Sequence, residues 1–440
     1  MILIRNIAYL VRDADRIERG VDLLIDGSRI AKIGHINAED CPQGTTILDG
    51  GNRAVIPGLV NAHTHLYQSM LKGHRDDLSL VDWCEQVTFP FVRRVLHRAW
   101  EEGITELGPL WSKLSAIEMI RNGITSFTDM DLNLDGVISA WVDVGIRGTA
   151  ALTMVDQWVP DDLMRSPEKS REETLAVVEE WHQTQPLVSV FLGPSAPFTC
   201  SDSLLAWIYE QSETYDLGIQ THISETAWEV EQSRKLTGVT PLAYLERFGL
   251  LARPITAVHC VHLTDEEIDL AAKYEVVVAY NAKSNMKLGS GIAPIVALHR
   301  AGVPIAIGTD GAASNDLLDL FEEMRCGLLL QKAAHADPTV LGARDAFRSA
   351  TEVGARACRI DAGVLDEGKL ADIVLIDLSA SHVFRLTDEI IPTLAYCAKG
   401  SDVETVIING RIVMQDRVIQ SIDELAILEE TRKVGEWYGK

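Results

Sequence analysis

The sequence predicts an α/β protein: a (β/α)8 TIM-like barrel with a small β-sandwich domain formed by both termini. Three observations predict this fold. Short β segments with hairpin turns occupy both ends of the chain, and the middle alternates apolar strand candidates with helical stretches. The length of 440 residues suits a barrel with an accessory domain, and 47% hydrophobic and 24% charged residues are the proportions of an ordinary globular protein.

Both ends of the chain have the pattern of short β-strands joined by tight turns. At the N-terminus, strand candidates lie at residues 1–4, 21–25 and 29–33, and in the tail at residues 371–377, 403–408 and 411–414. The turns Asp26-Gly27 and Asn409-Gly410 supply the positive φ angles of tight hairpins, so the first segment is predicted to be an antiparallel meander. We expect residues 1–56 and 365–440 to form one discontinuous β-sandwich domain, with the chain termini near each other in space.

A helix is predicted after the second hairpin. Ser421 and Glu424 have the spacing of a capping box, and Leu425 and Leu428 begin an amphipathic pattern. We therefore expect the domain to end in a C-terminal helix.

The middle of the chain, residues 57–364, is predicted to be the barrel. Its strand candidates lie at residues 54–65, 123–129, 145–154, 187–193, 217–222, 255–259, 275–281 and 303–310. Continuous apolar runs such as Val303–Gly308 suit parallel strands that are buried on both faces. A doubly wound open sheet is the alternative fold, but no GxGxxG follows the first strand and no GxxxxGK[ST] motif occurs.

Composition excludes several classes of partner. The chain has 64 acidic and 40 basic residues, a formal net charge of −24, which argues against nucleic-acid binding. No apolar stretch approaches the roughly 20 residues of a membrane span, and the first residues contain no signal-peptide core. The 7 cysteines are widely spread and form no CxxC pair, which indicates reduced thiols. We expect a cytoplasmic protein with no nucleic-acid or membrane partner.

Polar residues follow the predicted strands at the end where a parallel barrel carries its active site. His63 and His65 are two residues apart, which points both imidazoles to the same face of a strand. His222, His259 and Asp310 occupy equivalent positions on three other strands. Imidazoles with a carboxylate suit one divalent metal ion, zinc in the first place and ferrous iron as the alternative. The fourth candidate strand ends in FLGPSAP, without a lysine that could bridge a second metal ion.

Several segments, in order along the chain, resemble the amidohydrolase superfamily, in its branch of mononuclear deaminases and chlorohydrolases. These segments are PGLVNAHTHLYQSMLKGHRDD, EMIRNGITSFTDM, THISETAWEVEQS, HCVHL, SNMKLGSGIAPI and GTDGAASND. The resemblance runs from about Ile2 to Val413 and is nearest to the 5-methylthioadenosine and S-adenosylhomocysteine deaminases. It implies the same fold as the residue pattern, a barrel with a β-sandwich made from both termini.

The resemblance also implies roles for individual residues. The implied metal ligands are His63, His65, His222 and Asp310. Glu225 would be the catalytic acid, His259 a catalytic partner beside the attacking water, and Asp310 an acceptor for a hydrogen bond from that water. Trp83 and Ser195 fall at positions of substrate contact.

A metal site of this kind can hydrolyse a ring C–N bond. Bound zinc lowers the pKa of its water to about 7, and the resulting hydroxide can attack an electron-poor ring carbon that carries an amino group. Glu225 would transfer protons to the ring nitrogen and to the departing ammonia, a role typically worth about 10² to 10⁴ in rate. We predict a metal-dependent aminohydrolase, a hydrolytic deaminase, of a nitrogen heteroaromatic ring. The alternatives are a chloro- or alkylamino-hydrolase of a triazine-like ring and a non-catalytic scaffold derived from an amidohydrolase.

Two positions depart from the adenosine-type pattern. Val92 stands where those deaminases have a glutamate that would hold ribose hydroxyls, and Ser195 replaces a histidine. The implied catalytic set is complete, so the sequence favours a small heterocyclic substrate without ribose. We expect amino-substituted bases, pterins or triazines to be better substrates than adenosine derivatives.

Some residues also have a purely structural interpretation. Glu225 could be a solvated residue in the first turn of a helix capped by Ser224, and Trp83 could be a core aromatic. The acidic run Asp265–Glu267 is typical of a solvated helix face. The apolar run Leu328–Leu330 fits either packing of an outer helix or the interface of a homo-oligomer.

Overall fold

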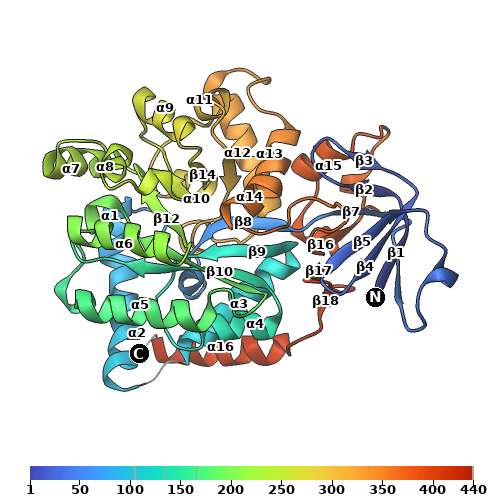
Figure 1. The fold of residues 1–440 in the computed structure, drawn as a ribbon, viewed down its shortest axis with the longest axis horizontal. Helices are drawn as coiled ribbons and strands as arrows, with labels where there is room; N and C mark the ends of the chain where they lie inside the picture. The colour runs from blue at the N-terminus through green and yellow to red at the C-terminus, as the bar shows by residue number, and fades with distance from the viewer. Residues whose placement is uncertain (104–105, 133, 165, 439–440) are drawn as a thin grey trace.

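An eight-stranded parallel sheet forms the centre of the protein. The computed structural model describes residues 1–103, 106–132, 134–164 and 166–438. The strand order in this sheet is β15-β14-β13-β12-β11-β10-β9-β8, and each neighbouring pair is parallel (Figure 1). The strands are β8 (Leu59–Thr64), β9 (Ile124–Asp129), β10 (Arg147–Met154), β11 (Val188–Pro194), β12 (Gly218–Ile223), β13 (Ile255–His259), β14 (Val277–Tyr280) and β15 (Ile305–Ile307).

Hydrogen bonds across the first and last strands nearly close this sheet into a barrel. The backbone N–H of Thr309 donates to Asn61 Oδ1 at 2.9 Å, and Asn61 Nδ2 donates to Thr309 Oγ1 at 2.7 Å. The N–H of Asp310 donates to the carbonyl of His63 at 3.0 Å. The predicted barrel is therefore confirmed, and the open doubly wound sheet is excluded.

Helices connect and surround the strands. They are α1 (Leu80–Trp83), α2 (Phe89–Glu101), α3 (Leu107–Arg121), α4 (Val137–Val144), α5 (Pro167–Trp181), α6 (Asp202–Thr214), α7 (Ala227–Thr237), α8 (Pro241–Arg247), α9 (Asp265–Lys273), α10 (Ala282–Lys287), α11 (Ile295–Arg300), α12 (Leu320–His335), α13 (Ala343–Ala350), α14 (Glu352–Ala357) and α15 (Ile390–Tyr396). In the four described ranges, no helix is long and apolar enough to cross a membrane.

Two expectations about helix surfaces need correction or refinement. Glu267 is buried, because it forms a capping box with Thr264 and also accepts from the N–H of Leu242, so the acidic run is not a uniformly solvated face. On α12, Leu328 is 3% exposed whereas Leu329 is 51% exposed, so the leucine run does not form one continuous surface. A homo-oligomer stays a prediction.

Strands from both termini form two further sheets beside the barrel (Figure 1). The first sheet has the order β5-β4-β1-β6, from β1 (Ile2–Ile7), β4 (Val21–Asp26), β5 (Arg29–Gly34) and β6 (Thr46–Asp49). The second has the order β19-β18-β17-β16-β7-β2-β3, from β2 (Tyr9–Val11), β3 (Ile17–Glu18), β7 (Arg53–Pro57), β16 (Ile373–Asp377), β17 (Val403–Ile408), β18 (Arg411–Gln415) and β19 (Val418–Ile419). Because β1 pairs with β6 in parallel, the first sheet is mixed rather than a pure meander.

The two terminal sheets share a buried core, as the predicted sandwich requires. Ile4 and Leu23 from the first sheet pack with Val55, Ile373 and Ile407 from the second. The hairpin turns also meet, because a Cβ on Gly410 would lie 1.8 Å from the carbonyl oxygen of Gly27. The sandwich is confirmed, while its boundaries at residues 56/57 and 364/365 stay a prediction.

The predicted strand 54–65 is in fact two strands in different sheets. β7 ends at Pro57 and pairs with β16 of the terminal sheet, whereas β8 begins at Leu59 in the barrel. The chain crosses between the sheets at Gly58, where a Cβ would lie 2.0 Å from Thr125 Oγ1. Residues 54–60 form one buried apolar run across the break, so periodicity could not reveal it.

The C-terminal helix α16 (Glu424–Tyr438) leaves the terminal sheets and packs against α3 of the barrel (Figure 1). Its cap is Asp423, whose Oδ1 accepts from the N–H of Ala426. The predicted box of Ser421 and Glu424 is wrong, because Glu424 pairs with Arg121 and Ser421 Oγ donates to the carbonyl of Val144. The helix carries the end of the chain away from β1, so the expected proximity of the termini is also wrong (Figure 1).

Candidate metal centre and active site

The barrel brings the predicted histidines and the aspartate together at the carboxyl ends of its strands. His63 lies on β8 and His65 follows that strand, while His222, His259 and Asp310 come from the ends of β12, β13 and β15. Nε2 of His63 and Nε2 of His65 each lie 3.4 Å from Asp310 Oδ1. Nε2 of His222 lies 3.3 Å from Nε2 of His65. Two sets of ligand atoms lie within 4.8 Å of one another: His63, His65 and Asp310, and His63, His222 and His259.

The outward nitrogen of each of these histidines faces a hydrogen-bond acceptor. His63 Nδ1 lies 2.9 Å from Gln220 Oε1, His65 Nδ1 lies 2.5 Å from the carbonyl of Met130, and His222 Nδ1 lies 2.5 Å from the carbonyl of Ser195. These acceptors place the proton on Nδ1 and leave the lone pair of Nε2 directed inward.

The donor set passes a simple test of fit to a metal ion. His63 is fully buried, and in the described part of the chain its Nε2 has no hydrogen-bond partner. A buried nitrogen without a partner is costly unless something fills its coordination. An ion among these Nε2 atoms and Asp310 would satisfy it, so the residues fit a divalent metal.

Electrostatics favour the protonation states that metal ligands require. Burial lowers the pKa of His65 to about 4 and lowers that of His222 well below its usual value, so both imidazoles are neutral at pH 7. Burial opposes the ionisation of Asp310, but the nearby imidazoles of His63, His259 and His65 outweigh burial and hold the pKa of Asp310 well below its usual range. Neutral imidazoles and an ionised carboxylate are the forms that bind metal.

Asp310 is held by groups other than the histidines. Its Oδ2 accepts from Ser284 Oγ at 2.5 Å and from Ser314 Oγ at 3.0 Å, and its Oδ1 accepts from the N–H of Gly311 at 2.7 Å. The backbone is strained at the same end of the barrel: His259 and Asp310 have left-handed φ angles of 69° and 59°. Such conformations cost about 1–3 kcal/mol each and cluster at functional sites.

Glu225 lies inside the site rather than on a solvated helix. It is 4% exposed, its Oε2 lies 3.5 Å from His259 Nε2, and its Oε1 accepts from Ser290 Oγ at 3.0 Å. Burial raises the pKa of Glu225. The cap of α7 is Thr226 rather than Ser224, so Glu225 precedes the helix and the interpretation as a solvated first-turn residue is wrong.

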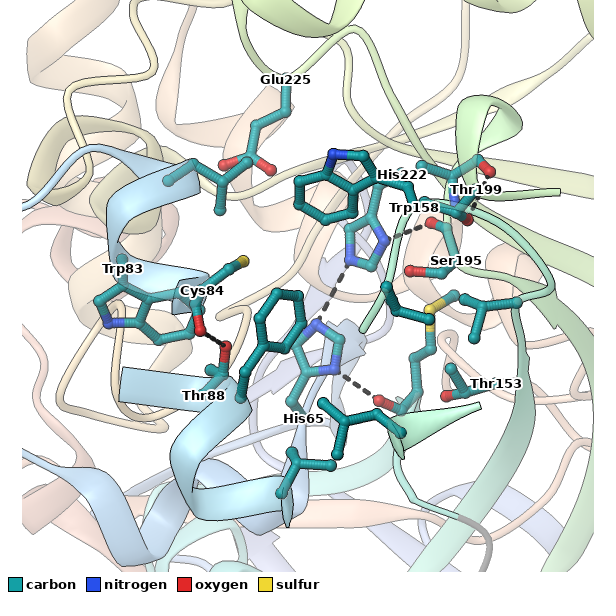
Figure 2. A pocket seen from close by; sticks show the side chains of 18 of the residues that line it. His65, Trp83, Cys84, Thr88, Thr153, Trp158, Ser195, Thr199, His222 and Glu225 are labelled. Atoms are coloured by element: carbon teal, nitrogen blue, oxygen red, sulfur yellow. Dashed lines mark hydrogen bonds between the residues drawn. The ribbon is translucent and has the colours of Figure 1, made fainter. Parts of the chain in front are cut away.

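A cavity of about 310 Å³ opens onto this cluster. Trp83, Val92 and Ser195 line it together with His65, His222, His259, Glu225 and Asp310. Figure 2 shows His65 and His222 between two groups of side chains: Trp83, Cys84 and Thr88 on one side, and Thr153, Ser195 and Thr199 on the other.

Aromatic rings line the outer part of the cavity. Trp158, at 42% exposure, lies with its ring centroid 5.2 Å from that of Phe198 and 5.5 Å from that of Trp228, and Phe89 lies 6.0 Å from Trp158. Trp158 also has a left-handed φ of 68°. A substituent on the ring of a substrate would therefore meet apolar aromatic surface.

Sequence reasoning did not assign a role to several residues of the site. Gln220 and Asn285 orient His63 and His259, and Ser314 and Ser290 hold Asp310 and Glu225. Each acts on a residue far away in the sequence or through a hydroxyl or amide without a spacing motif. Asn285, Ser290 and Ser314 lie in the segments SNMKLGSGIAPI and GTDGAASND that resemble the family, but the spacing of their amides and hydroxyls does not show which site residue each one holds.

The amidohydrolase family profile, described as "Amidohydrolase family", matches residues 54–413 of the chain. The chain belongs to the amidohydrolase family. It is 38% identical to the 5-methylthioadenosine/S-adenosylhomocysteine deaminase of Thermococcus sibiricus, over 94% of each chain. Among solved structures, it is similar to an adenosine deaminase from Xanthomonas campestris with bound zinc, at a TM-score of 0.91 and 31% identity, with 98% of this chain and 97% of the other covered. It is also similar to the atrazine chlorohydrolase of Arthrobacter aurescens TC1 in complex with zinc, at a TM-score of 0.90 and 26% identity, with 98% and 99% covered.

The reaction class follows from the family and the histidine cluster. The amidohydrolase described here is a metal-dependent hydrolytic deaminase of a nitrogen heteroaromatic ring, an enzyme acting on C–N bonds of cyclic amidines. The class predicted from the sequence is confirmed.

Proposed function

We propose that this amidohydrolase binds one zinc ion through His63, His65, His222 and Asp310 and deaminates an amino-substituted base, pterin or triazine. The observation that carries the metal assignment is the convergence of Nε2 atoms around the buried, unpartnered Nε2 of His63. Zinc is supported by the donor types and by the zinc bound in two similar structures. A single ion is supported by the end of β11, Pro194 followed by Ser195, which offers no bridging lysine.

The bound ion would supply a nucleophile, because a divalent metal lowers the pKa of a coordinated water to about 7. Glu225 then takes the role of proton carrier. It faces His259 and is held by Ser290, so it can pass a proton to a ring nitrogen and a second to the departing ammonia. Asp310 would accept a hydrogen bond from the attacking water, and His259, whose Nδ1 is held by Asn285, would orient that water through Nε2.

The ring preference rests on the wall of the cavity. Val92, which is 8% exposed, lines the cavity at the position where the resembling deaminases have a glutamate for ribose hydroxyls. Ribose hydroxyls left unpaired beside valine would cost about 1–3 kcal/mol. The aromatic rings of Trp158, Phe198 and Trp228 suit an apolar substituent better than a sugar.

Adenine-containing nucleosides are the second candidate, because the Thermococcus sibiricus relative is named for methylthioadenosine and S-adenosylhomocysteine. A panel of amino-substituted bases, pterins, triazines and adenine nucleosides, assayed for release of ammonia and chloride, decides between the two. We expect the highest kcat/KM on a ring without ribose. Methylthioadenosine or S-adenosylhomocysteine as best substrate by more than about tenfold would overturn this substrate proposal.

A further inference from the structure

The cavity contains a buried amide for which the proposed mechanism has no use. Gln68, in the 3-10 turn Leu66–Leu71 that follows His65, is 3% exposed and lines the cavity with Asp310. Among the described residues, its Oε1 has no hydrogen-bond partner, and its Nε2 makes a long contact of 3.5 Å with Tyr67 Oη. Buried amide groups that lack partners cost free energy, so an unpaired one in a substrate cavity indicates a group that the substrate satisfies.

The chain leaves room for this amide at the inner end of the cavity. A Cβ on Gly311 would lie 1.8 Å from Gln68 Oε1 and 2.1 Å from its Cδ. Gly311 does not have a positive φ, so space rather than backbone conformation requires glycine there. Gly311 follows Asp310 directly and donates to its carboxylate, which places the amide of Gln68 beside the metal-facing aspartate.

The turn that carries Gln68 is fixed before any substrate binds. Tyr67 stacks on Phe91 with ring centroids 6.1 Å apart and packs edge-on against Trp111 at 6.4 Å. The N–H of Tyr67 donates to Asp131 Oδ2 at 3.1 Å, and the N–H of Gln68 donates to the carbonyl of His65 at 3.2 Å. A preorganised amide loses little freedom when it binds a ligand.

We propose that Gln68 binds the reacting ring through its amide and selects rings with a lactam edge, an N–H beside a C=O. This inference rests on the proposed function and names the substrate class of the same site. A primary amide offers an acceptor and a donor side by side, so it pairs with a lactam edge through two parallel hydrogen bonds. The pair requires the amide oxygen to face the ring N–H and the amide nitrogen to face the ring C=O.

The same pairing disfavours an adenine ring. Apart from the amino group that reacts at the metal centre, an N9-substituted adenine has ring-nitrogen acceptors but no N–H donor, so Gln68 Oε1 would stay unpaired. Sites built to hydrogen-bond a polar group strongly reject analogues that lack it. The favoured substrates are amino-oxo rings of the guanine, pterin or hydroxytriazine type.

Three matched pairs of probes test this selection. In each pair both members have an amino-bearing carbon, and only the first has a lactam edge. The pairs are guanine with 2-aminopurine, pterin with 2-aminopteridine, and ammeline with 2,4-diamino-1,3,5-triazine. We expect the zinc-loaded enzyme to favour a lactam member by about 10- to 100-fold in kcat/KM.

Because the lactam also alters the reactivity of the ring, a variant separates recognition from chemistry. Q68L should lower kcat/KM for the lactam member by about 10- to 100-fold and change the other member by less than about threefold. Its zinc content should equal that of the wild type. Q86L is the matched control, because Gln86 is exposed and outside the cavity, and it should retain the wild-type preference.

Three results would overturn the inference: loss of zinc in Q68L, equal losses on both members of a pair, or a wild type that deaminates adenine nucleosides and no lactam ring. Ammonia release that E225Q abolishes would sustain the proposed chemistry in each of these cases. If the enzyme turns over none of the rings, the proposed function is wrong. The inference is then tested by calorimetry, which measures the affinities of the enzyme for guanine and for 2-aminopurine. Equal affinities for the two would then reject it.

Discussion

At the scale of single residues, the site depends on how each imidazole is oriented as much as on which residues are present. Gln220 shows this dependence. Its Oε1 accepts from His63 Nδ1 at 2.9 Å, and its Nε2 donates to the carbonyl of Ala62 at 2.8 Å. The amide is therefore locked with its oxygen toward the imidazole, which fixes the tautomer of His63. Gln220, a residue on another strand, therefore determines that the lone pair of His63 Nε2 faces the metal site.

Substitution of the proposed ligands should remove the metal. We expect loss of activity and lower zinc content in each of the variants H63A, H65A, H222A and D310A. Each variant lacks one ligand, and the three that remain do not complete the coordination of the ion. Q220L should keep the fold and weaken zinc binding by about 10- to 100-fold, since the imidazole loses its acceptor. Metal analysis after competition with a chelator measures both effects. Normal stoichiometry in H222A would contradict the proposed ligand set.

Substitution of the proton carrier should have a different effect. E225Q is expected to retain metal and fold and to lose about 10² to 10⁴ in kcat, because a carboxamide cannot transfer the proton. H259N is the informative comparison, since His259 also lies within ligand distance of His63 and His222. Retained zinc in H259N supports its role beside the water, whereas lost zinc would make it a ligand. Lost zinc in E225Q would assign Glu225 to the metal instead of the acid role.

The sequence could indicate those residues whose spacing is tied to local geometry. His63 and His65 alternate on one strand, and Glu225 follows His222 closely in a segment that resembles a known motif. Gln68 and Gln220 were not predicted, because their value comes from contacts with Gly311 and His63 that span 243 and 157 positions. Amides and hydroxyls that orient a ligand become recognisable only when the fold has brought them to it.

At the scale of elements, tertiary contacts decided what local patterns left open. The sequence pattern predicts one strand at residues 54–65, but the chain crosses at Gly58, close to Thr125, and divides this segment between two sheets. The predicted capping box of Ser421 and Glu424 does not form at the start of α16, because Glu424 pairs with Arg121 and Asp423 caps the helix instead. In both cases the residue that sets the boundary of the element is distant in sequence. Periodicity and capping rules therefore predicted that the element exists but not where it begins or ends.

Helix α12 contains a buried acid that should make stability depend on pH. Glu323 is 1% exposed, accepts from Asn315 Nδ2 at 2.5 Å, and burial raises its pKa to about 8. The folded state thus holds this proton more tightly than the unfolded state, whose carboxyl titrates near its ordinary value of 4.5. The contribution of Glu323 is fully present below about pH 4.5 and is lost as pH rises through 8.

E323Q should reduce this dependence, because the amide does not titrate. Urea unfolding at pH 6 and pH 9 is expected to show a smaller loss of unfolding free energy in E323Q than in the wild type. E322Q is the matched control, since Glu322 lies beside it on α12 and pairs with Lys283 at 2.8 Å nearer the surface. An identical pH dependence in E323Q and the wild type would show that Glu323 keeps its ordinary titration in the folded protein.

At the scale of the whole molecule, the barrel and the terminal sheets are joined by a buried ion pair. Arg147 begins β10 of the barrel and Asp372 precedes β16 of the terminal sheet, with side chains 6% and 1% exposed. Arg147 Nε and Nη2 lie 2.9 and 3.2 Å from the two carboxylate oxygens. Asp372 also accepts from the N–H groups of Asn409 and Gly58. One aspartate therefore connects a barrel strand, the crossover between the sheets and a hairpin turn.

Loss of either partner should be costly because it leaves the other charge buried and unpaired. R147A is expected to lower the free energy of unfolding by about 3–5 kcal/mol. R93A breaks a pair with Asp162 in which the side chains are 47% and 54% exposed, and it should cost much less than R147A because solvent screens that pair. Urea unfolding at pH 7 compares the two variants.

A second substitution separates unpaired charge from lost packing at this junction. D372N in the R147A background removes the buried charge and keeps an oxygen for the N–H of Asn409, so the double variant should be more stable than R147A alone. A double variant no more stable than R147A would assign the cost to the lost packing of the arginine. Equal losses in R147A and R93A would mean that the terminal sheets are held on the barrel by their apolar contacts, because the ion pair would then contribute no more than one at the surface.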